Sequence, residues 1–122
     1  MTRLWLACGG LVGLTAIAMA AFAAHGMPKG IDAAAVQSVR AGVRMQGWHA
    51  LALLATGLWA ARGGWLADLA GGAFLLGVLL FCGGVYASAL ANAGFGRVAP
   101  VGATLLMLGW LLLTLSAVFP RE

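Results

Sequence analysis

The stretch LWLACGGLVGLTAIAMAAFAA, residues 4–24, contains no charged residue and indicates the fold class of the whole chain. A helix rises about 1.5 Å per residue and the hydrocarbon core of a bilayer is about 30 Å thick, so a helix of this length crosses once. Three further apolar runs follow, and we expect spans over residues 46–61, 69–92 and 100–119. The connections between these apolar runs are short, which favours consecutive helices that pack antiparallel to one another. The sequence therefore predicts an all-α membrane protein, a four-transmembrane-helix antiparallel bundle.

The composition excludes an ordinary soluble protein. Of 122 residues, 63% are hydrophobic and 8% are charged, against roughly 25% charged in soluble domains. Four spans use most of the chain, which indicates a single integral membrane domain over residues 1–122. The formal net charge is +4, but the seven Lys and Arg are scattered singly, so we expect no nucleic-acid partner. Anionic lipid headgroups of the bilayer are the expected counterions.

Residues 33–45 form a polar-sided segment before the second expected span. Asp32 is a suitable N-cap for a helix that begins at Ala33. One face of that helix carries Gln37, Arg40 and Arg44, and the other carries Val36, Val39 and Val43. We expect an amphipathic start to the second helix, lying at the membrane interface and continuing into residues 46–61. Residues 62–64, Arg-Gly-Gly, end that span.

Four short motifs resemble a known family. AFAAHG at residues 21–26 is similar to GAFGAHG, and QGWHAL at residues 46–51 is similar to QxxHAL, with Met45 where the family pattern has Tyr. GGVY at residues 83–86 and APVGA at residues 99–103 are similar to GSLY and TPLGG. On these motifs the chain is identified as a member of the domain of unknown function 423 family, the YgdD-like small bacterial membrane proteins. The resemblance implies four helices, a multi-pass location in the bacterial inner membrane and no established activity.

Polar residues within the spans are the candidate functional residues, because such groups are expensive in lipid. His25 ends the first span and His49 begins the second, so we expect both near one membrane face. The candidate ligand-binding residues are His25, His49, Gln46, Arg44, Arg40, Tyr86 and Asn92. They suit a lipid headgroup, a quinone or another small anionic or carbonyl-bearing ligand. The alternative is structural: the histidines hold the helical hairpin together, and Tyr86 and Asn92 bond between helices.

No cofactor is predicted, although two alternatives stay open. His25 and His49 are the minimum for a bis-His haem, and a quinone is the other candidate. We expect no metal site. Cys8 and Cys82 each lie in an apolar run, where a lone cysteine behaves as a small hydrophobe.

The sequence does not decide between a transporter, an enzyme and a binding or accessory protein. Proton-coupled export needs a carboxylate within the membrane, and Asp32, Asp68 and Glu122 fall outside the apolar runs. No nucleophile with an adjacent base is visible, so no catalytic residue is assigned and enzyme activity stays uncertain. The expected role is an accessory or assembly protein, or a lipid- or quinone-binding bundle, on a larger membrane complex or as a homo-oligomer. The alternatives are a small-molecule transporter or channel-like oligomer, and a bis-His haem-binding subunit.

Overall fold

In the computed structural model, which describes residues 1–91 and 98–119, all secondary structure of those residues is helical. Helix α1 covers Thr2–His25, α2 covers Ala33–Leu90 and α3 covers Val98–Val118. Each of the three is long and apolar enough to cross a membrane. The predicted all-α membrane protein is confirmed. As expected, Asp32 caps α2, and its carboxylate accepts a hydrogen bond from the backbone N of Ala34 at 3.3 Å.

The prediction of four separate helices is wrong, because the described residues form three. Residues 62–68 were expected to connect the second and third spans, but they remain within α2, a helix of 58 residues. The departure from helical geometry within α2 is at Gly64, with φ 62° and ψ −145°. Glycine adopts this conformation readily since it has no Cβ, whereas other residues are strained there. A single glycine thus redirects the helix where we expected a loop.

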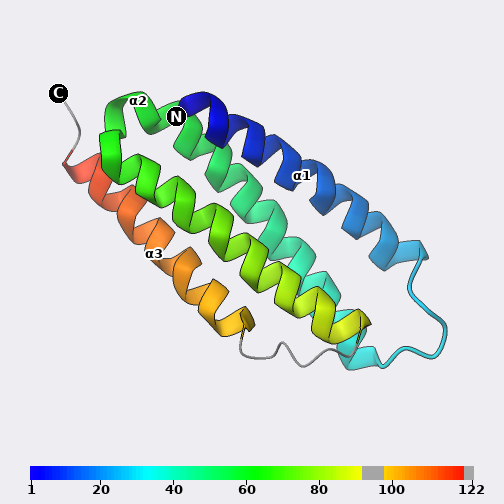
Figure 1. Cartoon of the computed structure of the whole chain (residues 1–122). Coiled ribbons are helices and arrows are strands. Elements are labelled where there is room, and N and C mark those ends of the chain that lie inside the picture. Colours follow the sequence, from blue (N-terminus) through cyan, green and yellow to red (C-terminus); the bar gives the residue numbers. More distant parts are fainter. Residues whose placement is uncertain (92–97, 120–122) are drawn as a thin grey trace.

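Helix α2 folds back on itself at Gly64. We call residues 33–63 its first arm and residues 65–90 its second arm. Tyr86 of the second arm donates a hydrogen bond to Gln46 of the first at 2.8 Å, and the Cys82 thiol donates to the Gly42 carbonyl at 3.4 Å. The two arms therefore run antiparallel and side by side, with α1 along one edge of the pair and α3 along the other (Figure 1).

The bundle has two distinct ends (Figure 1). The N-terminus, the turn at Gly64 and the end of α3 share one end, which we call the termini end. The connection from α1 to α2 lies at the opposite end, which we call the loop end. The described cations divide between the two ends. Arg3 starts α1 and Arg62 lies two residues before Gly64, so both belong to the termini end. Lys29 lies in the connection from α1 to α2, and Arg40 and Arg44 lie in the half of the first arm nearer that connection.

Packing is inverted relative to a soluble protein. Large apolar side chains such as Ile17 and Leu58 point outward, with exposed fractions of 73% and 76%. Small residues line the helix contacts instead. A Cβ added at Gly77 would lie 3.0 Å from the Gly102 carbonyl oxygen, and one added at Gly9 would lie 3.0 Å from that of Ala50. Close backbone approach through small residues is how helices associate in lipid, where apolar burial gives little driving force.

Candidate functional site

Gln46 lies at the centre of a buried hydrogen-bond cluster that joins α1 to both arms of α2. Its amide nitrogen donates to the Val12 carbonyl at 3.2 Å and to the Thr15 hydroxyl at 2.8 Å. Its amide oxygen accepts from the Tyr86 hydroxyl at 2.8 Å. Both amide N–H groups therefore have partners, and the orientation of the amide is fixed by its neighbours. The predicted residues Gln46 and Tyr86 are thus brought together, in an arrangement that holds three helical segments in register.

His49 is also buried, with 2% of its surface exposed, and both ring nitrogens have partners. The Trp110 indole N–H of α3 donates to Nε2 at 3.0 Å, so Nε2 must be the acceptor. Nδ1 then carries the proton and donates to the Met45 carbonyl at 2.7 Å. The Phe74 ring packs against both aromatic partners, with centroid distances of 5.8 Å to His49 and 5.2 Å to Trp110. A ligand could reach either nitrogen of His49 only by displacing one of these bonds.

The structure does not bring His25 and His49 together. His25 is the last residue of α1 and is exposed, whereas Gly13 of α1 lies level with Ala50, beside His49. At about 1.5 Å per residue, the helix from Gly13 to His25 rises about 18 Å. The expectation that both histidines lie near one membrane face is therefore wrong. In this arrangement they cannot ligate one haem iron.

Arg40 and Arg44 lie one turn apart on the first arm, and both are exposed. They line a pocket with a volume of about 260 Å³ between this arm and the end of α1. The remaining described lining residues are Ala20, Ala23, Ala24 and Val43. The pocket thus combines two cationic side chains with a small apolar surface, and its described lining includes no carboxylate. This is a separate pocket from the clusters around Gln46 and His49.

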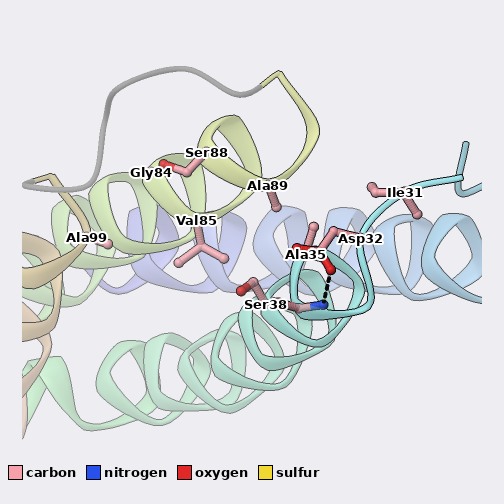
Figure 2. A pocket seen from close by; sticks show the side chains of 10 residues that line it. Ile31, Asp32, Ala35, Ser38, Gly84, Val85, Ser88, Ala89 and Ala99 are labelled. Atoms are coloured by element: carbon pink, nitrogen blue, oxygen red, sulfur yellow. Dashed lines mark hydrogen bonds between the residues drawn. The ribbon is translucent and has the colours of Figure 1, made fainter.

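A larger hollow opens at the loop end, between the start of α2, the second arm and the start of α3. Figure 2 shows Asp32, Ser38 and Ser88 around it, and its volume is about 510 Å³. The Asp32 carboxylate is occupied by the N-cap bond to Ala34, drawn as a dashed line. Asn92, which we expected to act one turn beyond Ser88, lies outside the described residues.

Sequence reasoning did not identify Trp110 as a hydrogen-bonding residue. It sits in the middle of α3, a largely apolar helix, and it is not among the candidate residues named from the sequence. A signal was available, however. An indole N–H at that depth has no water to bond, so it needs an acceptor on another helix. Near the termini end, the Trp59 N–H also donates to a side chain of α3, the buried Ser116 hydroxyl, at 3.0 Å.

The fold and the hydrogen-bond clusters around Gln46 and His49 together define a class of protein. It is a small, multi-pass, all-helical integral membrane protein whose buried polar groups link its helices. Residues 19–103 match the family model "Protein of unknown function (DUF423)", so the chain belongs to that family, as the motifs predicted.

Relatives agree in length and location. A UPF0382 membrane protein of Haemophilus influenzae is 36% identical over 91% of this chain and 90% of its own length. The UPF0382 inner membrane protein YgdD of Escherichia coli is 29% identical over 96% of this chain and 91% of its own. YwdK of Bacillus subtilis, a UPF0382 membrane protein, is 25% identical over 95% and 97%. No solved structure is significantly similar. The expected location in the bacterial inner membrane is confirmed by these relatives and the apolar helices.

Proposed function

We propose that this protein is a lipid-binding bundle that crosses the membrane four times and holds an anionic phospholipid headgroup between α1 and α2. A straight helix of 58 residues would be about 87 Å long, far more than the roughly 30 Å hydrocarbon core. Each arm of α2 is long enough to cross on its own. Two crossings by α2 are therefore the arrangement that keeps its apolar residues in lipid.

The pocket of Arg40 and Arg44 is the observation that carries the lipid proposal. Two guanidinium groups one turn apart offer several N–H donors to phosphate oxygens, and paired N–H···O bonds make arginine a strong phosphate ligand. The alanine floor contributed by α1 leaves room for the glycerol end of a lipid. The amphipathic start of α2 has its valine side against the bundle, with Val39 fully buried, so the arginines are directed to the headgroup region.

The buried clusters around Gln46 and His49 do not suit a quinone. A quinone needs hydrogen-bond donors for its carbonyl groups, and the donors of Gln46 and His49 already have protein partners. A fixed lipid on a compact bundle suits an accessory role beside another membrane protein. The partner in such an assembly stays a prediction.

The test measures which lipids stay bound when the protein is released from nanodiscs containing equal amounts of phosphatidylglycerol and phosphatidylcholine with identical chains. Native mass spectrometry counts each lipid. We expect phosphatidylglycerol to be enriched on the wild-type protein. At about 1 kcal/mol per arginine, the Arg40→Gln/Arg44→Gln variant should lose that enrichment by about 30-fold.

The matched control is Arg3→Gln/Arg62→Gln, which removes the same charge from the termini end. It should keep most of the enrichment, because neither residue lines the pocket. Equal losses in the two double variants would show a nonspecific charge effect and would reject the pocket as the headgroup site.

A further inference from the structure

A second feature lies at the opposite end of the bundle, around Asp68. Hydropathy placed this residue outside the apolar runs, but the structure places it within α2, near the start of the second arm and half-buried. The indole N–H of Trp5 donates to Asp68 Oδ1 at 3.0 Å. Trp5 is itself only 4% exposed and packs directly on Gly71. Helix α1 thus fixes the position of a carboxylate at the edge of the membrane.

Asp68 stands at the head of an apolar groove between the second arm and α3. The groove has a volume of about 540 Å³, and its other described lining residues are Leu69, Gly72, Ala73, Leu76, Leu105, Leu108 and Leu112. Leu69 and Leu76 on its rim are each 50% exposed, so the groove opens toward lipid. From Asp68 to Leu76 the helix rises about 12 Å, close to the depth of one leaflet's hydrocarbon layer.

We propose that this groove binds a phospholipid whose headgroup ends in a primary ammonium, such as phosphatidylethanolamine. The ammonium bonds to the Asp68 carboxylate, and an acyl chain lies along Gly72 and Ala73. The groove is complementary to such a lipid, because it offers one negative charge at the headgroup level and an apolar surface below it. A carboxylate has about four acceptor positions, and Trp5 uses one, so ammonium N–H groups can take others.

The chemistry also predicts a preference between lipids. A primary ammonium has three N–H donors, whereas the quaternary ammonium of choline has none and cannot approach a carboxylate as closely. An exposed ion pair is worth up to about 1 kcal/mol, which corresponds to about fivefold in binding. The groove should therefore favour ethanolamine over choline headgroups by about that factor.

The experiment places the wild-type protein in nanodiscs of phosphatidylethanolamine and phosphatidylcholine with identical chains, in equal amounts, and counts retained lipids by native mass spectrometry. We expect about fivefold enrichment of phosphatidylethanolamine. Asp68→Asn should remove it. The Asn side-chain oxygen still accepts from Trp5, so this variant keeps the contact between α1 and α2.

A pair of glycine variants tests the groove separately from the charge. Gly72→Leu adds bulk at a residue that lines the groove, and the one atom within 4 Å of its added Cβ would be Trp5 Cη2, at 4.0 Å. Gly83→Leu is the control on the same arm, at an exposed position with nothing within 4 Å of the added Cβ. Gly72→Leu should lower retained phosphatidylethanolamine severalfold, and Gly83→Leu should not.

The outcomes separate this site from the arginine pocket. Arg40→Gln/Arg44→Gln should keep the ethanolamine preference, and Asp68→Asn should keep the phosphatidylglycerol preference, because the two sites lie at opposite ends. The groove proposal is overturned if wild-type protein shows no ethanolamine preference, if Asp68→Asn retains it, or if Gly72→Leu and Gly83→Leu retain equal amounts.

Discussion

Replacing Gly102 by alanine tests how closely α3 approaches the second arm of α2. An added Cβ would collide with the backbone N of Phe81 and would lie 2.8 Å from the Gly77 carbonyl oxygen. These are backbone atoms, so no side-chain rotation can relieve the contact and the helices must separate. Overpacking of this kind costs about 1–3 kcal/mol, while Ala in place of Gly returns roughly 0.5–1 kcal/mol of helix stability. From the middle of these two ranges, we expect Gly102→Ala to lower the free energy of unfolding by about 1 kcal/mol.

The assay is unfolding in detergent micelles with increasing dodecyl sulfate, followed by circular dichroism. Gly83→Ala is the control, because nothing lies within 4 Å of its added Cβ. That variant should be as stable as wild type or slightly more stable. If Gly102→Ala matched Gly83→Ala, the two helices would not be in backbone contact and the packing described above would be refuted.

Three further substitutions address the polar links and the turn. Trp110→Phe removes the donor to His49 and should destabilise by about 1 kcal/mol in the same assay. Gln46→Leu should destabilise by about 1–3 kcal/mol because it leaves the Tyr86 hydroxyl without its acceptor. In a double-mutant cycle with Tyr86→Phe, the coupling energy should be about 0.6 kcal/mol or more. Gly64→Ala forces a non-glycine residue to φ 62° and ψ −145°, a region used almost only by glycine, and should cost about 1–3 kcal/mol.

The Trp110 and Gly64 substitutions each have a matched control. Trp65→Phe changes an exposed indole and should leave stability near wild type. Gly10→Ala alters a helical glycine with nothing within 4 Å and should not destabilise. A zero coupling energy in the Gln46 cycle, or equal effects of the paired Trp or Gly substitutions, would contradict the corresponding contact.

Hydropathy predicted the helical membrane character, but it could not show how the second and third expected spans join. Arg62 and Asp68 interrupt the apolar pattern, which favours a loop between separate helices. The chain instead keeps helical hydrogen bonding almost throughout and reverses at Gly64. Hydropathy is averaged over several residues, so it cannot show a reversal of the chain that depends on the φ angle of one residue.

The candidate site shows a similar division. Gln46 was identified because a polar side chain within a span needs a partner, and the structure supplies Thr15 and Tyr86. The expectation that His49 and His25 lie near one membrane face was wrong. Two residues at adjacent ends of consecutive apolar runs need not lie at the same depth in the membrane. His49 lies several turns along the first arm, toward the middle of the bundle, while His25 ends α1. Only the alignment of α1 with α2 reveals that difference.

The most direct test of the double crossing by α2 is the sidedness of single cysteines in a Cys8→Ala/Cys82→Ala background. Arg3→Cys, Gly30→Cys, Arg62→Cys and Ala91→Cys are each treated in intact cells with a membrane-impermeant maleimide, and again after permeabilisation. If α2 crosses the membrane twice by folding at Gly64, positions 3 and 62 must label from one side and positions 30 and 91 from the other. Labelling of position 62 from the same side as position 30 or position 91 would contradict the double crossing.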